Sequence, residues 1–427
     1  MRDLGRGWRA LSGQHGVDPG RGGDAGAGVP VDSTRLVGLI RDSLPAGETI
    51  GIAVSGGGDS TALLHLALQA GLRVEAATVD HRLRDDSAAE ALAVARVCAG
   101  LGVPHVVRVW DHGPEVPGNL MDAARQARMA LIGDWARGRG IGHVALGHTR
   151  DDQAETVLMG LARAAGLAGL SGMRRAWVDG GVTFHRPLID AGREELRDWL
   201  RAQGLTWVDD PTNDNPRFTR VRARQVLAAL APLGITAEGL AGVAGHLALA
   251  QEVVSAAVQA AAGRHVAEVA GALRLAGGLW AEPLDVRRQV VGAAVGWLAG
   301  ARYAPRADDL ARFTRALAEG RDATLRGCRA RQGWILREAR ALGGPVPVGR
   351  VWDGRWTVMG AAGEVRALGV DGLRQCPEWR ALGVPRQVLE VTPGVWQSDR
   401  LVAAPCAGFG PATATCTPGF HDVLLSH

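Results

Sequence analysis

The segment SGGGDS holds the residues of this sequence that are best suited to chemistry. Its members are Ser55, Gly56, Gly57, Gly58, Asp59 and Ser60. Three adjacent glycines can adopt positive φ and let backbone N–H groups come close to an anion. The two serines add hydroxyl donors, and a helix that begins here would direct its positive end at the same point. The segment is therefore predicted to bind phosphate.

The kind of phosphate site follows from what accompanies the glycines. A Walker loop needs a lysine for the terminal phosphates, and all 48 basic residues of this chain are arginine. A dinucleotide fingerprint needs a third glycine where Thr61 stands, although Asp80 lies near the place of its ribose-binding acid. Asp59 would repel phosphate unless Mg²⁺ bridged the two. The loop therefore favours a phosphate chain, or a leaving pyrophosphate, that is bound through a metal ion.

Further polar residues follow later predicted elements. Asp80 and His81 end the second predicted strand, where a nucleotide would lie. Asn119 is the predicted N-cap of a helix on which Arg125 and Arg128 stand one turn apart, so that they could neutralise phosphate charge. A polar turn and a solvated basic face are the ordinary structural alternatives for these residues.

The segment LGHTRDDQAET, residues 146–156, is the second strong signal. It begins at a strand end and continues into a helix. Asp152 and Glu155 are three residues apart and therefore share a face, and Asp151 is within reach of Glu155. Acids in a first helical turn often only complement the helix dipole. Beside a phosphate site, they would also form a pocket for Mg²⁺ or for the ammonium group of a ligand.

Short apolar runs alternate with helical patterns in the first half of the chain. Strands are expected at residues 49–55, 73–80, 104–110 and 143–148, with helices between them. This alternation predicts an α/β fold, a Rossmann-like parallel sheet covered by helices on both faces. Ligands bind such sheets at the carboxyl ends of the strands, which is where the polar motifs lie.

Composition divides the rest of the chain. We expect a disordered tail at 1–30, a catalytic ATP-binding domain at 31–230, a mostly helical domain at 231–340 and a small β-rich α+β domain at 341–427. The pattern from 237 to about 320 is Ala/Leu-rich and helical, and residues 323–340 are typical of a hairpin.

Charge and cysteine content limit the class of protein. A net charge of +4 permits a polyanionic partner. Five cysteines, an odd number without a CxxC pair, do not suggest a disulfide framework or a zinc site. The first residues lack an apolar signal segment, and no uninterrupted apolar run is long enough to span a bilayer. A cytoplasmic protein without a membrane partner is expected.

SGGxDS after a first strand resembles the loop of the PP-loop ATP pyrophosphatase superfamily, whose members cleave ATP between the α and β phosphates. The strings GHTRDDQAET with GLAGLSGM, HRPLI and DDPTNDNPRFTRVRAR keep the order and spacing of one family within it, tRNA(Ile)-lysidine synthase. The resemblance covers about residues 48–232. The RNRIR-like string of that family stands here as RVRAR, with Val221 in place of asparagine.

The resemblance implies an ATP-dependent ligase that acts on the wobble cytidine of the tRNA(Ile) with a CAU anticodon. ATP would adenylate the C2 carbonyl oxygen of cytosine, and the ε-amine of L-lysine would then attack C2 and release AMP to leave lysidine. Arginine-rich surface would bind the tRNA. The sequence does not define the oligomeric state, and a homodimer is one option.

Site roles are likewise implied by the resemblance. The expected ATP site comprises Ser55, Gly56, Gly57, Gly58, Asp59, Ser60, Asp80 and His81. The expected catalytic residues are Asp59, Arg125, Asp152, Glu155 and Arg222. Asp59 and Glu155 are the candidates to hold Mg²⁺, and Asp152 is the candidate to hold the amines of lysine. Arg125 would stabilise charge at the adenylated centre, and Arg222 would act there or on the tRNA.

Other functions stay open at this point. A PP-loop enzyme that inserts sulfur into tRNA commonly uses paired cysteines, and none stand near the predicted core. A synthetase that uses glutamine would carry a glutaminase segment with a nucleophilic cysteine, and none is visible. A non-catalytic RNA-binding protein would not need a complete SGGGDS segment or the acids that follow it.

Overall fold

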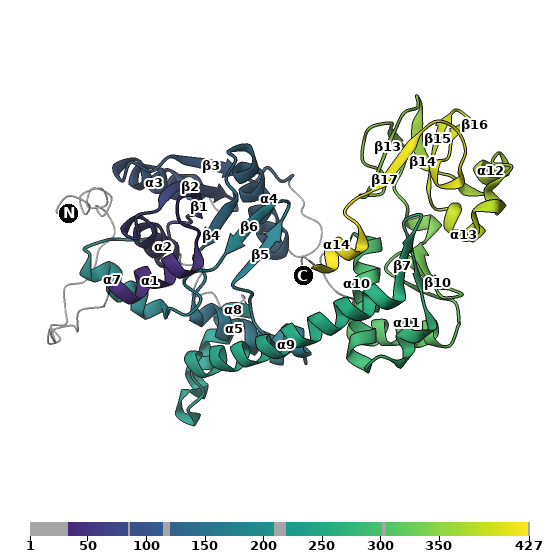
Figure 1. Ribbon diagram of the computed structural model, residues 1–427. Helices are drawn as coiled ribbons and strands as arrows, with labels where there is room; N and C mark the ends of the chain where they lie inside the picture. Colours follow the sequence, from purple (N-terminus) through teal and green to yellow (C-terminus); the bar gives the residue numbers. More distant parts are fainter. Residues whose placement is uncertain (1–32, 84–85, 114–119, 209–218, 301–304, 426–427) are drawn as a thin grey trace. The chain divides into compact units, whose positions relative to one another are not determined.

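The structure of the protein is a computed structural model that describes residues 33–83, 86–113, 120–208, 219–300 and 305–425 (Figure 1). The chain divides into two compact units, Met1–Gln251 and Glu252–His427. The expected tail, the expected N-cap Asn119 and residues 209–218 of the turn-rich string lie outside the described residues. The three expected boundaries, near residues 30, 230 and 340, stay predictions.

The described strands of the first unit form one six-stranded sheet with the order β3-β2-β1-β4-β6-β5. These strands are β1 (Thr49–Ala53), β2 (Arg73–Asp80), β3 (His105–Val109), β4 (His143–Leu146), β5 (Ala176–Asp179) and β6 (Val182–His185). All neighbouring strands are parallel except β5, which pairs antiparallel with β6. The predicted parallel α/β sheet is confirmed. The chain leaves β1 for β2 on one side and later returns to β4 on the other, so the strand order reverses between β1 and β4.

Helices alternate with these strands. They are α1 (Ser33–Ser43), α2 (Gly58–Gln69), α3 (Ser87–Gly100), α4 (Leu120–Gly138), α5 (Arg150–Leu161), α6 (Leu167–Leu170), α7 (Arg193–Ala202), α8 (Thr219–Leu230), the short 3-10 helix η2 (Ala231–Leu233) and α9 (Ala237–His265).

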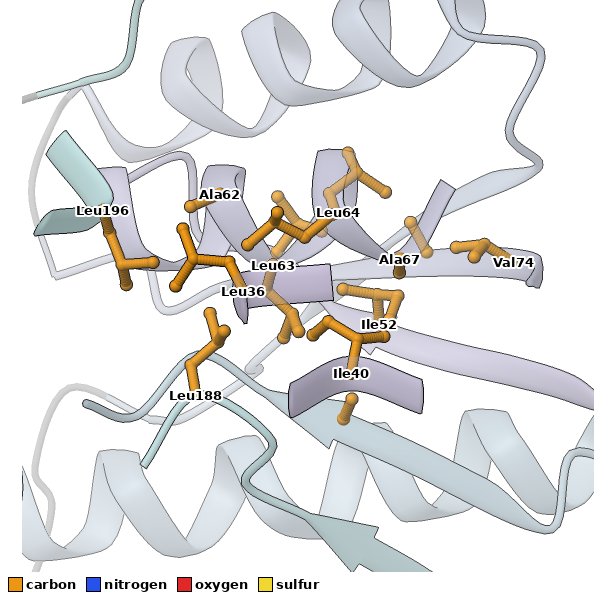
Figure 2. Close-up of a cluster of buried hydrophobic side chains, with 14 of the residues drawn as sticks. Leu36, Ile40, Ile52, Ala62, Leu63, Leu64, Ala67, Val74, Leu188 and Leu196 are labelled. Atoms are coloured by element: carbon orange, nitrogen blue, oxygen red, sulfur yellow. The ribbon is translucent and has the colours of Figure 1, made fainter. Parts of the chain in front are cut away.

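Two apolar cores lie on opposite faces of the sheet. Ile52 of β1 packs against Leu63 of α2 and Leu36 of α1, and Leu196 of α7 closes the same cluster (Figure 2). The other core joins α4 to β4 and β6. Side chains alternate between the faces of a strand, so Gly51 faces the second core, where a Cβ would lie 3.0 Å from the Trp135 ring. The sheet is therefore covered on both sides, and its strand ends are left to carry the site.

The second unit combines antiparallel sheets with short helices. Its elements are β7 (Val266–Val269), β8 (Ala272–Leu275), η3 (Gly277–Ala281), α10 (Leu284–Ala299), α11 (Ala307–Ala318), β9 (Ala323–Leu325), β10 (Cys328–Arg331), β11 (Trp334–Arg337), η4 (Ala339–Ala341), β12 (Val346–Pro347), β13 (Trp356–Met359), β14 (Glu364–Ala367), α12 (Gly369–Arg374), η5 (Trp379–Leu382), α13 (Arg386–Leu389), β15 (Pro393–Gln397), β16 (Arg400–Ala403), η6 (Pro405–Ala407), β17 (Thr413–Cys416) and α14 (Phe420–Leu425). The expected hairpin is present as β10 and β11, which pair antiparallel.

One hairpin interrupts the stretch that the sequence presents as helical. Strands β7 and β8 pair across Ala270 and Gly271, which both have positive φ, at 49° and 67°. That is the backbone of a tight two-residue turn, and its right-handed twist suits a hairpin. The alternation in VAEV and ALRL is too short to be told from a helical pattern by periodicity alone.

Helix α9 is long and rich in alanine. By length and composition alone it could cross a bilayer, with a mean hydropathy of 1.3 over its most apolar window, of which 11% is buried. Polar residues interrupt its apolar run at His246, Gln251 and Glu252. Its last turns place Val258 and Ala261 in the core of the second unit.

Truncating a core side chain tests the first apolar cluster. Leu63 is fully buried, so Leu63→Ala should lower the free energy of unfolding by about 3 kcal/mol. Leu92→Ala, at a position that is 56% exposed on α3, is the matched control and should change it by less than about 0.5 kcal/mol. Chemical denaturation of the three proteins measures both values, and equal losses would contradict this description of the core.

Candidate active site

The loops that follow β1 and β4 meet where the strand order reverses. In open α/β sheets this is where ligands bind, because the two loops diverge and leave a crevice. At Gly147 the two loops are in contact, because a Cβ there would lie 3.0 Å from the backbone carbonyl of Asp59. A side chain at position 147 would push the two loops apart. The glycine thus keeps the phosphate loop and the start of α5 in contact.

The SGGGDS loop has the geometry of an anion cradle. Gly56 has φ +87°, which a side chain would strain, and a Cβ there would lie 3.0 Å from Val94. The N-cap of α2 is Gly57, which has no side chain to bond the first-turn N–H groups, so those donors remain for a ligand. The Ser60 hydroxyl lies 3.1 Å from both the Ser55 hydroxyl and the Ser55 backbone nitrogen, and this fixes the bend.

Three carboxylates converge beside this loop on Arg193, the first residue of α7. Arg193 Nε lies 3.3 Å from Asp59 Oδ2. Its Nη2 lies 3.0 Å from Asp152 Oδ1, and its Nη1 lies 3.2 Å from Glu155 Oε1. The Arg193 backbone N–H also donates to Asp151 Oδ2 at 2.7 Å. The structure thus brings together the acids that were singled out from the sequence, around a cation that was not.

Helix α8 adds two more arginines on one face. Arg220 Nη1 lies 3.2 Å from Asp152 Oδ1 and 3.5 Å from Glu155 Oε2. Arg224, four residues on, places Nε 2.6 Å from Glu155 Oε1. Arg222 lies on the other side of the helix, is exposed, and bonds Thr219 at 3.3 Å. The expected catalytic role of Arg222 stays a prediction, and its exposed position suits the alternative contact with RNA.

Burial and neighbouring charge set the protonation of the cluster. Burial raises the pKa of Asp59 to about 6, although Arg193 opposes the shift. Burial would also raise the pKa of Asp152, but Arg193 and its other neighbours outweigh it and hold that pKa below the usual value. Burial lowers the pKa of Arg193, but the carboxylates around it leave that pKa above the usual value. Of these two carboxylates, Asp59 is thus the one whose negative charge is less compensated.

The second expected nucleotide contact, Asp80 and His81, lies at the end of β2. Asp80 Oδ1 accepts hydrogen bonds from Ser87 Oγ at 2.7 Å and from the Arg82 backbone N–H at 2.9 Å. One oxygen of this carboxylate therefore holds the turn that leads to α3. Arg128 Nε donates to His81 Nε2 at 3.3 Å, and the buried Nδ1 of His81 has no hydrogen-bond partner.

Arg125 of α4 is one of several cations near His148. It is exposed, and it is close enough to His148 and Arg186 to help lower the pKa of both side chains. Arg186, from the HRPLI string, donates to His148. The site arginines that sequence reasoning did not select are Arg186, Arg193, Arg220 and Arg224. For Arg186 the string itself was a signal, whereas for Arg193 only the start of a helix was visible.

Comparison with known proteins agrees with this geometry. Residues 32–230 match a family model described as a PP-loop domain, so this part of the first unit is a PP-loop ATP-binding domain. The chain is 44% identical to the tRNA(Ile)-lysidine synthase of Ruegeria pomeroyi over 396 residues, which cover 88% of this chain and 94% of the relative. It is 34% identical to that of Brucella anthropi over 393 residues, which cover 82% and 84%. The chain belongs to the tRNA(Ile)-lysidine synthase family, which confirms the resemblance and extends it beyond residue 232.

The solved structures include more distant neighbours. A tRNA thiolase, NcsA from Methanococcus maripaludis, matches 50% of this chain and 78% of its own, with 14% identity and a TM-score of 0.44. That likeness is too remote to bear on the reaction.

The raised pKa of Asp59 predicts a pH-dependent stability. The folded chain holds a proton on Asp59 that the unfolded chain loses at its ordinary pKa of 3.8, so this contribution is present below about pH 4 and is lost as pH rises through about 6. Asp59→Asn cannot ionise and should therefore stabilise the ligand-free protein by about 2 kcal/mol at about pH 8, and by almost nothing near pH 4.

Chemical denaturation at the two pH values measures this difference. Asp42→Asn, at an exposed position on α1, is the control and should show no such pH dependence. An Asp59→Asn effect of the same size at both pH values would contradict the prediction.

Proposed function

We propose that this protein ligates L-lysine to C2 of the wobble cytidine in the tRNA(Ile) with a CAU anticodon. ATP first adenylates the C2 carbonyl oxygen and pyrophosphate leaves; the ε-amine of lysine then attacks C2 and AMP leaves. The observation that carries the proposal is the phosphate-binding loop beside the cluster of acids. It is supported by the similarity of the chain, over most of its length, to a tRNA(Ile)-lysidine synthase. Such a reaction takes place where ATP, lysine and tRNA meet, in the cytoplasm.

The alternatives are less well supported. The five cysteines are unpaired, and burial raises the pKa of the Cys98 thiol to about 11, which suits a core residue and not a sulfur carrier. The relatives named above are synthases, which does not favour a non-catalytic RNA-binding protein.

Asp59 fits a magnesium ion, and Glu155 fits one less well. Mg²⁺ is commonly held by one or two carboxylates together with substrate phosphates. The under-compensated charge of Asp59 at the loop suits that role. Among the described residues, no group of three or more acidic, histidine or cysteine side chains could hold a metal alone. Glu155 is fully buried and both its oxygens lie beside arginines, so it is better placed to anchor them. When bound, the ion would offset the charge of the phosphate chain.

A pocket of about 510 Å³ beside the cluster suits free lysine. Its polar part is lined by Asp151, Glu155, Arg193, Glu194, Arg197 and Arg224. Leu227, Ala228 and Ile235 form an apolar wall. Lysine carries a carboxylate, two ammonium groups and an apolar stem, so it needs both signs of charge and an apolar surface. We assign the ammonium groups to the acids, with Asp152 behind Glu155, and the carboxylate to Arg197.

Transfer of labelled lysine tests the reaction directly. Purified protein with ATP, Mg²⁺, labelled lysine and a CAU-anticodon tRNA(Ile) transcript should leave label on the RNA. A transcript with U in place of the wobble C should stay unlabelled, because uracil lacks the C4 amino group and the unprotonated N3 of cytosine. Asp59→Asn should abolish labelling while leaving the affinity for tRNA nearly intact. Substantial turnover by this variant would show that the reaction does not need the Asp59 carboxylate to hold a metal ion at the phosphates.

The lysine pocket makes a separate prediction. Arg197→Ala removes the charge assigned to the carboxylate and should raise the KM for lysine roughly tenfold or more, with little change in the KM for ATP. Arg201→Ala, one turn further along α7, is the matched control because Arg201 is exposed and pairs with Asp198. Steady-state kinetics decides, and equal effects of the two substitutions would place the carboxylate elsewhere.

A further inference from the structure

His148 and Arg186 form a hydrogen-bonded pair at the end of β4. Arg186 Nε donates to His148 Nδ1 at 3.2 Å. Arg186 is held in place by its surroundings: it is 8% exposed, its guanidinium lies 4.1 Å from the centre of the Trp177 ring, and its Nη1 donates to the Arg174 carbonyl oxygen. The pair is therefore a fixed part of the site.

The donor capacity of arginine decides where the proton of His148 lies. A guanidinium group has five N–H donors and no acceptor, so in this pair Nδ1 must accept. A neutral imidazole carries its single proton on the other nitrogen, which here is Nε2. In the described part of the chain, Arg186 is the one hydrogen-bond partner of the imidazole, which leaves Nε2–H for a ligand.

The charges that face His148 keep the ring neutral. Burial lowers its pKa most, and Arg186, Arg125 and Arg220 lower it further, while Asp152 opposes them. Protonation would also break the bond to Arg186, because a protonated Nδ1 cannot accept. His148 is therefore unsuited to act as a general base, since its one lone pair is already bonded.

We propose that His148 is a neutral hydrogen-bond donor in the reaction, whose Nε2–H bonds a phosphoryl oxygen of bound ATP, and that Arg186 is the positioning residue that fixes its tautomer. The choice of ligand rests on the proposed function. Gly147 places the start of this segment against the phosphate loop, and the cations Arg125 and Arg220 nearby favour an anionic ligand. A preorganised donor of this kind is most effective when negative charge grows on the oxygen that it bonds.

Two amide substitutions separate a donor at Nε2 from a structural role. The amide of glutamine extends as far as Nε2, whereas that of asparagine reaches only the position of Nδ1. His148→Gln should keep tRNA-dependent pyrophosphate release within about tenfold of the unmodified protein, and His148→Asn should lose roughly 100-fold or more in kcat. His246→Gln, at an exposed position of α9, is the control and should leave the rate unchanged. Equal losses for the glutamine and asparagine variants would overturn the proposal.

The tautomer can be observed without any turnover. Nitrogen NMR of the full chain with labelled histidine, assigned by comparison with His148→Gln, should show Nδ1 unprotonated and Nε2 protonated throughout the pH range in which ordinary histidines titrate. In Arg186→Met the ring should lose its fixed tautomer, so that Nδ1 carries part of the proton, and its pKa should rise because one opposing charge is removed. A proton on Nδ1, or titration of His148 in the unmodified protein, would overturn the proposal. Failure of the unmodified protein to label tRNA with lysine would instead overturn the proposed function, so the two failures are distinguishable.

Discussion

One guanidinium group, that of Arg193, makes the charge of this site compatible with its burial. It lies within 3.3 Å of an oxygen from each of Asp59, Asp152 and Glu155, on two different helices. Three carboxylates this close would repel one another and would take up protons if no cation stood between them. Loss of Arg193 itself would leave buried carboxylates uncompensated, and removing one partner of a buried ion pair in this way typically costs about 3–5 kcal/mol. The starts of α2, α5 and α7 are thus joined at one point.

Arg220 and Arg224 complete the balance. With Arg193 they supply three positive charges against three carboxylates, so the cluster is close to neutral before any ligand enters. Under the proposed function, the ammonium groups of lysine would meet acids that are already paired. Binding would then be an exchange of ion pairs in which the lysine carboxylate receives an arginine. Such an exchange favours a ligand that carries both signs of charge. A simple amine would take an acid from its arginine and leave that arginine unpaired, which disfavours its binding.

Local sequence patterns predicted most of the secondary structure of the first unit, but they did not predict which distant residues pair in the site. Strands β1 to β4 of the α/β sheet and the loop at residues 55–60 follow from short apolar runs and adjacent glycines, which are local signals, whereas β5 and β6 were not predicted. That Asp152 and Glu155 share a face follows from helical spacing alone. Arg193 is 38 residues beyond Glu155, and nothing in the sequence places it there. The same limit explains why Arg222 was selected and Arg220 and Arg224 were not. Helical spacing puts Arg220 and Arg224 on one face of α8, but it does not say which face of α8 meets α5. In the second unit, the four-residue strands β7 and β8 were expected as helix, whereas β10 and β11, of the same length, were predicted as a hairpin.

The two oxygens of Asp152 have separate tasks. Oδ2 accepts from the backbone N–H and the hydroxyl of Thr149 at 2.8 and 3.0 Å, and this closes the capping box of α5, while Oδ1 faces the arginines. An alanine at this position would therefore loosen the first turn of a helix as well as remove a charge. An asparagine whose oxygen kept the Oδ2 position would preserve the cap and discard the charge alone. Loss of activity at Asp152 can thus be attributed to electrostatics only when the helix start is known to be intact.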